Sequence, residues 1–187
     1  MSFSFHSVKS SVHELKNVTT IAVCGLLIAL NAVLGLLTIV ISNVLQIRFS
    51  FLAIAVSGML YGPVVGGIVG AVGDIVNYML RPSGPFFPGF TLNAILSGLI
   101  YGLILYKKPV TVWRVLAANT IVMLLVNYLL NSLWLSMMYG QAFLAVLSVR
   151  IVTNLILLPI NVAMLYTLIK FIQKLPVFRL KKRSKLL

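Results

Sequence analysis

Acidic residues are almost absent from this chain of 187 residues, which has two, Glu14 and Asp74, against fifteen lysines and arginines. Two carboxylates are too few for the clustered acids that enzymes acting on phosphates through metal ions need. Cysteine is also nearly missing, because Cys24 stands alone in an apolar run. This excludes a disulfide framework and a four-cysteine metal site. We expect neither a metal nor any other cofactor.

Charged residues make up 9% of the sequence and apolar residues 60%, and the mean hydropathy is +1.08. Soluble domains carry roughly 25% charged residues, so this chain has too few of them to cover a globule. The composition therefore indicates a membrane protein of one compact domain. The polar residues 1–17 and the length of the first apolar segment argue against a cleavable signal peptide.

Six apolar segments are candidates for membrane helices, which need ~20 residues per span and fewer where a helix is broken. The second is ended early by Gly62 and Pro63, so we expect it to be too short to cross alone and to be shielded by protein. The sequence thus predicts an all-α domain at 18–172, between a polar segment at 1–17 and a basic tail at 173–187. The expected helices are 18–41, 51–61, 64–80, 91–106, 112–138 and 149–172.

The lysines and arginines predict the orientation. If six helices cross the membrane and the N-terminus is inside, twelve of the fifteen cations lie inside, and Arg48, Arg81 and Arg150 lie outside. Cytoplasmic segments are enriched in lysine and arginine, so both termini are expected in the cytoplasm of a multi-pass membrane protein. The basic tail predicts contact with anionic lipid. Nucleic acid is not an expected partner, because no folded module combines basic and aromatic residues.

A loop rich in proline and phenylalanine separates the third and fourth expected helices, with the sequence RPSGPFFPGF at residues 81–90. A plain membrane turn is short and polar. Here prolines restrict the backbone while glycines permit conformations that other residues avoid. Such a loop keeps a defined shape yet can hinge, and we expect it to close over a pocket. The residues expected to form this gating loop are Pro82, Gly84, Pro85 and Pro88.

Polar and aromatic side chains also occur within or beside the apolar segments. Polar groups are costly in a membrane and by default mark function. With the expected topology they converge near the outer leaflet, where three arginines offer paired donors to carboxylates. The candidate ligand-binding residues are Arg48, Asp74, Asn77, Tyr78, Arg81, Phe87, Gly89, Phe90, Thr91, Asn93, Asn131, Trp134, Arg150 and Asn154.

These residue types predict binding rather than catalysis. Amides donate and accept hydrogen bonds at the edge of a heterocycle, aromatic rings stack on its face, and arginines bind carboxylates. The expected ligand is an organic anion with an aromatic ring system in an outward-facing pocket. Plainer explanations stay open: asparagines can join helices, Asp74 can pair with Arg81, phenylalanines can form an interfacial belt, and arginines can anchor helix ends.

The first expected helix carries small residues three or four positions apart, at Ala22, Gly25, Ala29 and Ala32. Small residues let a second helix approach closely. Spacing alone leaves it open whether that helix belongs to this chain or to a partner.

In its six helices, its stripe of small residues and the segment RPSGPFFPGFTLNAILSG at 81–98, the chain resembles the substrate-binding S components of energy-coupling-factor (ECF) vitamin transporters. The resemblance extends from about residue 18 to 172, and the loop followed by Thr91, Leu92 and Asn93 is similar to that of the folate-specific members. It implies a subunit without enzymatic activity in a bacterial plasma membrane. The implied partners are folate or a related pterin, a membrane scaffold subunit and two ATPase subunits.

The same resemblance implies roles for individual segments. Residues 42–50 and 81–91 would close the pocket, and Gly25 and Ala29 would contact the scaffold, although Gly25 stands where the family usually has alanine. Asp74 and the asparagines would bind the pterin of folate. Its rings would lie among Phe87, Phe90 and Trp134, and its glutamate would meet Arg48, Arg81 or Arg150.

Three other functions stay open on the sequence. The same fold could bind another water-soluble vitamin, but cationic thiamine suits three arginines poorly, and pantothenate has no ring for the aromatic residues. An intramembrane lipid-modifying enzyme would need more acidic residues than the chain has. A channel subunit would need a ring of charges or a filter sequence, and neither is recognisable.

Overall fold

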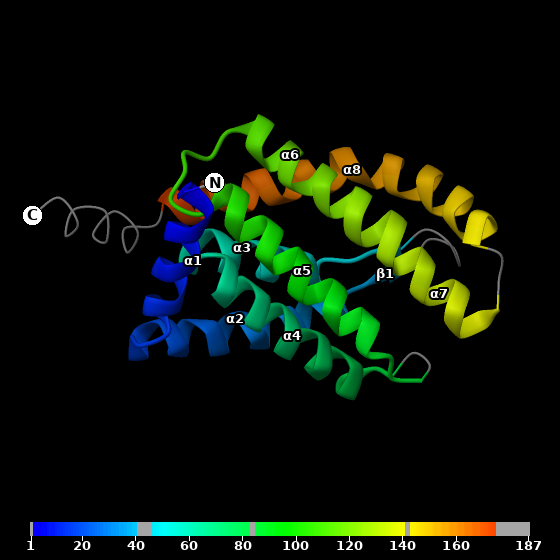
Figure 1. Cartoon of the computed structure of the whole chain (residues 1–187), viewed down its shortest axis with the longest axis horizontal. Helices are drawn as coiled ribbons and strands as arrows, with labels where there is room; N and C mark the ends of the chain where they lie inside the picture. Colours follow the sequence, from blue (N-terminus) through cyan, green and yellow to red (C-terminus); the bar gives the residue numbers. More distant parts are fainter. Residues whose placement is uncertain (1, 41–45, 83–84, 141–142, 175–187) are drawn as a thin grey trace, which may run out of the picture.

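The computed structural model describes residues 2–40, 46–82, 85–140 and 143–174, which form an elongated bundle of helices (Figure 1). Two short strands, β1 and β2, pair antiparallel with Ile39 opposite Ile47. The sequence did not predict this ribbon. Apart from it, the predicted all-α fold class is confirmed. The elements are α1 (Ser2–Glu14), α2 (Val18–Leu36), β1 (Ile39–Val40), β2 (Gln46–Ile47), α3 (Ser50–Tyr61), α4 (Pro63–Leu80), α5 (Pro88–Leu105), α6 (Val112–Val122), η1 (Met123–Leu130), α7 (Asn131–Tyr139) and α8 (Phe143–Lys174).

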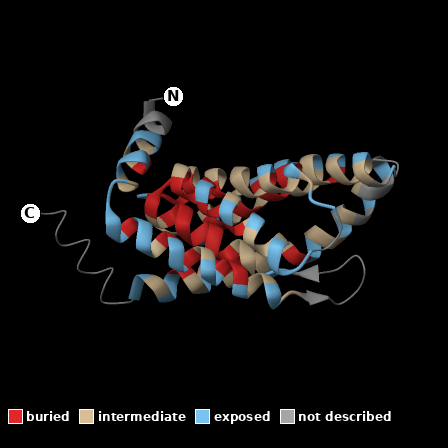
Figure 2. Cartoon of the chain, turned by 90° about the horizontal axis from the view of Figure 1, so that it is seen from below, coloured by how far each residue is buried: buried red, intermediate tan, exposed pale blue. Residues whose placement is uncertain are grey.

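Five helical segments in the described residues are long and apolar enough to cross a membrane. The remaining predicted segment, the second along the chain, is α3, which has 12 residues and falls short of that length. Every residue from Leu52 to Met59 is buried, and α3 runs through the most buried part of the bundle (Figure 2). A helix that is apolar on all sides belongs in such a position. The prediction that protein shields this short helix is therefore confirmed.

The helices around α3 pack with their backbones close together. A Cβ atom at Gly66 would lie 2.7 Å from the carbonyl oxygen of Gly98 and 2.8 Å from the Cα of Gly58. Only glycine permits this approach at the crossing of α3, α4 and α5, because real Cβ atoms do not come so near to backbone. The crossing fixes the position of α4 and α5, which carry much of the candidate site.

Helix α1 was predicted only as part of a polar segment, yet it is docked on the bundle through Ser11. This fully buried side chain donates a hydrogen bond of 2.8 Å to the carbonyl of Tyr61. Its Oγ also accepts from the amides of Val64 and Val65, at 3.1 and 3.2 Å. These are the amides that an N-cap side chain normally satisfies. Gly62, the N-cap of α4, has no side chain and a φ of 93°, so Ser11 of α1 supplies the cap instead.

Replacing Ser11 with alanine is expected to lower the free energy of unfolding by about 1–2 kcal/mol, the cost of losing an N-cap. Thermal unfolding of the purified protein in detergent would measure the change. Ser10→Ala is the matched control, because Ser10 only joins Tyr106 and Lys107 at the surface and should have a smaller effect. Equal stability of Ser11→Ala and the unmodified protein would contradict the capping role.

The predicted fifth helix is continuous in direction but not uniform, because α6 and α7 are joined by the π-helix η1. π-helical turns are rare and often occur at functional sites. The fourth predicted helix begins three residues early, at Pro88, the first position of α5. Proline suits that position because its missing N–H has no partner there in any case. Pro88 was predicted to lie in the gating loop, but in the structure it is the first residue of α5.

Candidate ligand-binding site

Asp74 is the one acidic residue of the spanning helices, and it faces α5. Its Oδ2 accepts a hydrogen bond of 2.8 Å from the hydroxyl of Thr91. Both side chains are half-buried at the end of the bundle where α4 ends and α5 begins (Figure 1). A carboxylate has about four acceptor positions, so one hydroxyl leaves capacity for further donors. Asp74 can therefore hold Thr91 and a ligand at the same time.

One arginine comes near this carboxylate from another part of the chain, and a second arginine comes near the first. Arg48, between β2 and α3, interacts electrostatically with Asp74 and also with Arg150 of α8. Desolvation lowers the pKa of the Arg48 guanidinium and the Asp74 carboxylate opposes the shift, yet the side chain is exposed. Protein thus surrounds Arg48 while water still reaches it. Two like charges in one place favour an anion that contacts both.

An aromatic cluster formed by Phe87, Phe90 and Trp134 lies at the start of α5. The ring of Phe87 is 5.5 Å from that of Trp134 and 5.9 Å from that of Phe90, measured between centroids. Gly89 lies buried beside them, and a Cβ there would overlap the Phe87 ring and come 2.8 Å from Cδ2 of Trp134. The cluster thus depends on glycine at this position, and its rings can stack on a flat ligand.

Asparagines connect the cluster to the helix interiors. The indole Nε1 of Trp134 donates to Oδ1 of the buried Asn93 at 3.1 Å, which joins α7 to α5. Near the junction of η1 and α7, Oδ1 of Asn131 and Oγ of Ser132 are buried without a hydrogen-bond partner among the described residues. Buried polar atoms are normally paired, so the unmatched acceptor of Asn131 can take a hydrogen bond from a ligand.

Asn77, a candidate for the ligand, forms hydrogen bonds within the bundle. Its Nδ2 donates to Oδ1 of Asn31 at 2.5 Å and to the carbonyl of Gly73 at 2.9 Å. Asn31 is itself buried in α2 and donates to the carbonyl of Ser50 at 2.8 Å. This chain of amides joins α4, α2 and the start of α3. The plainer explanation, in which an asparagine joins helices, therefore describes Asn77.

The remaining candidates lie around the site without entering these contacts. Tyr78 packs edge to face on Phe86 at 5.1 Å, and Asn154 donates to the carbonyl of Arg150 on its own helix at 3.0 Å. Arg81 follows α4 and is exposed, and the interaction of Asp74 is with Arg48 rather than Arg81. Of the gating-loop residues, Pro82 and Pro85 are exposed, and Gly84 lies outside the described residues.

Two polar residues in this region were missed on the sequence. Asn31 is an amide inside an apolar run, the same signal that identified the other asparagines. Ser132 is fully buried, but a serine in an apolar helix gives little signal, because its hydroxyl usually bonds to the backbone of the preceding turn.

Comparison with known proteins places this geometry in a family. Residues 19–169 match the family model described as "ECF transporter, substrate-specific component". The chain is 36% identical to the folate transporter FolT of Clostridium novyi over 163 residues, which cover 87% of this chain and 95% of the relative. It is 40% identical to FolT of Leuconostoc mesenteroides over 151 residues, covering 78% and 81%.

A solved structure has the same fold. The crystal structure of FolT bound with folic acid superposes with a TM-score of 0.74 at 40% sequence identity, covering 81% of this chain and 93% of that one. The residues that match the family model, 19–169, include Asp74, the aromatic cluster and the two arginines.

Proposed function

The chain belongs to the family of substrate-specific components of ECF transporters, and from this we propose that it binds folate in the membrane for import. The family is a transporter component and not an enzyme. ATP hydrolysis therefore belongs to partner subunits, which we take to be two ATPases held by a membrane scaffold. The five apolar helices long enough to span make it a membrane protein, and we propose a bacterial plasma membrane as its location.

The observation that carries the proposal is the meeting of three chemistries at one end of the bundle. Folate has a flat pterin with ring and amine donors, a benzoyl ring, and a glutamate with two carboxylates. Asp74 and Asn131 offer acceptors to the pterin, the aromatic cluster offers faces to the rings, and Arg48 and Arg150 offer charge to the glutamate. A dianion between these two arginines would also relieve their mutual repulsion.

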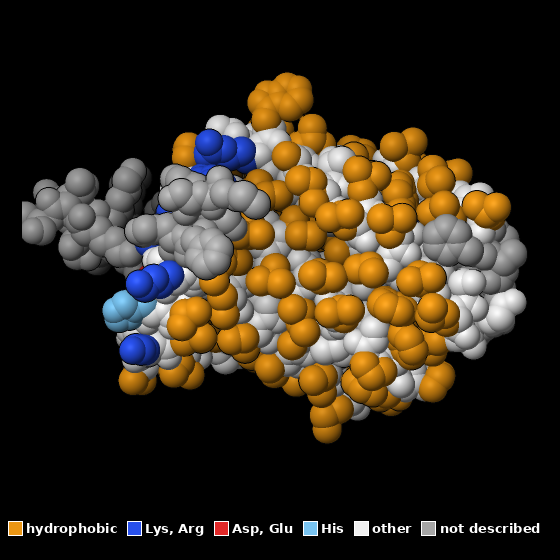
Figure 3. Space-filling view, in the orientation of Figure 1, with side chains coloured by type: hydrophobic (Ala, Val, Ile, Leu, Met, Phe, Trp, Pro, Cys, Tyr) orange, Lys and Arg blue, Asp and Glu red, His pale blue; other side chains and the backbone are white. Residues whose placement is uncertain are grey.

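The orientation that we propose has the site facing outward and both termini in the cytoplasm. Helix α1 and the C-terminal end of α8 lie at the same end of the bundle (Figure 1). Lysine, arginine and histidine side chains gather at that end on the face shown in Figure 3, and the rest of that face is mostly apolar. Enrichment of cations on the cytoplasmic side supports this arrangement. In this proposed orientation, α3 is the sixth of the predicted segments, a short helix that is surrounded by the rest of the protein.

Mass spectrometry of small molecules that co-purify with the full chain, followed by calorimetric titration with folate, tests the proposal. We expect one folate per chain, retained through purification or bound on titration, and no turnover by the isolated protein. Thiamine, riboflavin and pantothenate serve as competitors. If one of these binds and folate does not, the family assignment stands and the folate assignment is wrong.

The aromatic cluster gives a test at one residue. Gly89→Ala is expected to lower folate affinity roughly tenfold, because the added methyl group displaces the rings of Phe87 and Trp134 at a cost of about 1–3 kcal/mol. Gly25→Ala is the matched control, since a Cβ there meets no atom within 4 Å in the described residues outside its own helix turn. Calorimetry on both variants measures the difference in folate affinity. If both bound folate equally well, the aromatic cluster would not be part of the folate site.

A further inference from the structure

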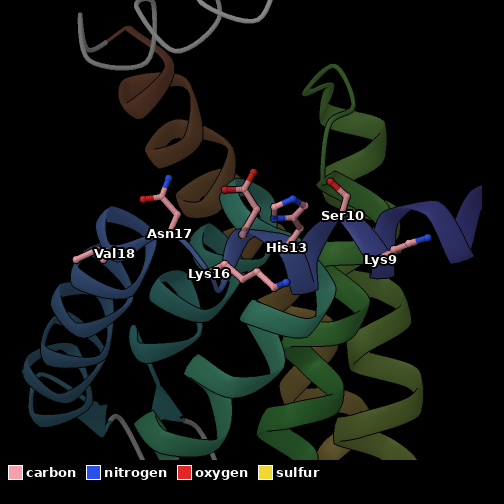
Figure 4. Close-up of a pocket in the computed structure, with 7 residues that line it drawn as sticks. Lys9, Ser10, His13, Lys16, Asn17 and Val18 are labelled. Atoms are coloured by element: carbon pink, nitrogen blue, oxygen red, sulfur yellow. The ribbon is translucent and has the colours of Figure 1, made fainter.

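A hollow of about 830 Å³ lies beside the junction of α1 and α2 (Figure 4). Figure 1 places this junction at the opposite end of the bundle from the end of α4 and the start of α5, where we propose that folate binds. Its described lining comes from α1, the turn after it and the first residue of α2, and it includes Lys9, His13, Lys16 and Asn17. Nothing in the binding of folate requires a hollow at this place. Its lining residues therefore call for a separate explanation.

The lining is basic because α1 and the turn that follows it carry basic residues. Lys9 and His13 are four residues apart, so they lie on one side of α1, and Lys16 follows in the turn between α1 and α2. Ser11 lies on the opposite side of α1, and both Ser11 and Leu15 of the turn pack on the bundle. All three basic side chains are exposed, and the ammonium groups of both lysines have no hydrogen bond or ion pair within the described part of the chain. The two ammonium groups are thus available to an anion.

Two further features set the local charge. Glu14 also lines the hollow, but its Oε2 accepts a long hydrogen bond of 3.4 Å from Thr20 of α2. One carboxylate does not neutralise two lysines and an imidazole that can donate. The N-terminus of α2 adds partial positive charge, and Asn17 caps it by accepting from the amide of Thr19 at 3.0 Å. The hollow therefore favours a negatively charged group.

The surroundings indicate which kind of anion it is. The hollow lies where α2, a helix long and apolar enough to span, begins. In the orientation that we propose, this is the depth of the lipid headgroups. Val18, which lines the hollow, is 79% exposed, and Ile21 next along α2 is 55% exposed, so an apolar surface continues from the basic one. A free anion would have no use for that surface, whereas a lipid has an acyl chain to cover it. We infer that this hollow binds the phosphate group of an anionic phospholipid, with an acyl chain along the start of α2.

Native mass spectrometry of the delipidated full chain, titrated with phosphatidylglycerol or phosphatidylcholine, tests the inference. We expect one phosphatidylglycerol to bind in preference to phosphatidylcholine. Lys9→Gln with Lys16→Gln should lower that affinity at least about tenfold, since each lysine near anionic lipid contributes roughly 1 kcal/mol. Lys9→Arg with Lys16→Arg should keep it. The matched control, Lys170→Gln with Lys174→Gln, removes two exposed charges of α8 that do not line the hollow and should change affinity less than about twofold.

Folate binding checks that each variant is folded, because the folate site lies at the other end. Unchanged lipid affinity in the Lys9 and Lys16 double glutamine variant would overturn the inference. An equal loss in the α8 control would also overturn it, since the attraction would then be to general surface charge. Displacement of the lipid by millimolar inorganic phosphate would show a site for free anions and overturn the assignment to lipid.

Discussion

Alanine in place of Asp74 is expected to weaken folate binding at least about tenfold, which corresponds to ~1.5 kcal/mol for one charged hydrogen bond. The carboxylate already holds the hydroxyl of Thr91 at 2.8 Å, which fixes its orientation before the ligand arrives. An oriented acceptor loses less entropy on binding than a mobile one. Isothermal titration calorimetry with folate measures the loss, and thermal unfolding without ligand shows how much of the change is structural.

Two further variants separate charge from shape at this position. Asp74→Asn keeps the volume of the side chain, but its amide group would place hydrogen-bond donors opposite the donors of the pterin. We therefore expect it to bind folate as weakly as Asp74→Ala does. Thr91→Val removes the orienting hydroxyl and keeps the carboxylate, so its effect should be smaller. If Asp74→Ala combined with Asn131→Ala left folate affinity unchanged, the pterin would bind elsewhere and the assignment of both residues would be wrong.

The helices could be predicted because the bilayer and burial both act through hydrophobicity. Apolar runs marked the segments, and Gly62 with Pro63 marked the end of α3, where the φ of 93° at Gly62 needs glycine. The docking of α1 could not be predicted, because it depends on one serine reaching an amide pair more than 50 residues away. The ribbon of β1 and β2 has two residues in each strand, too few to produce a periodic pattern.

The sequence allowed us to predict which residues belong to the candidate site, but not which contacts each of them makes. The cost of polar groups in apolar helices directed attention to Asp74, Asn93 and Trp134. In the structure Asp74 is hydrogen-bonded to Thr91 of α5, and Trp134 of α7 to Asn93 of α5, while their role in binding a ligand stays a prediction. Asn77 carries the same signal and forms a link to Asn31 instead. An amide that binds a ligand and one that joins helices have the same cost and the same spacing. Only the position of the facing helix distinguishes them.

For the stripe of small residues on α2 it was also open whether packing inside the chain explains it, and here packing inside the chain does not. The buried face of α2 includes Cys24, Leu27 and Asn31, whereas Gly25 and Ala29 are exposed. Apart from its own turn of the helix, no atom of the described residues lies within 4 Å of a Cβ placed on Gly25. Packing inside this protein therefore does not explain the small residues there, unlike the glycines at the crossing of α4 and α5. A partner helix that approaches closely does explain them.

Leucine at both Gly25 and Ala29 is expected to abolish folate uptake by the assembled transporter, with a loss of at least about tenfold, and to leave folate binding by the isolated chain unchanged. The added side chains find open space in the monomer but hold a partner helix away. Uptake of labelled folate into proteoliposomes and calorimetry on the isolated chain measure the two quantities. Ala117→Leu with Ala163→Leu enlarges two exposed alanines on α6 and α8 and is the matched control.

The separation of the two readouts identifies the cause. If uptake fell equally in the control, enlarging any exposed surface would be enough, and the face of α2 would have no special role. If folate binding fell together with uptake, the substitutions would act through the fold rather than through docking. Loss of uptake alone, confined to the α2 variant, requires that this face meets another subunit after folate is bound at the far end of the bundle.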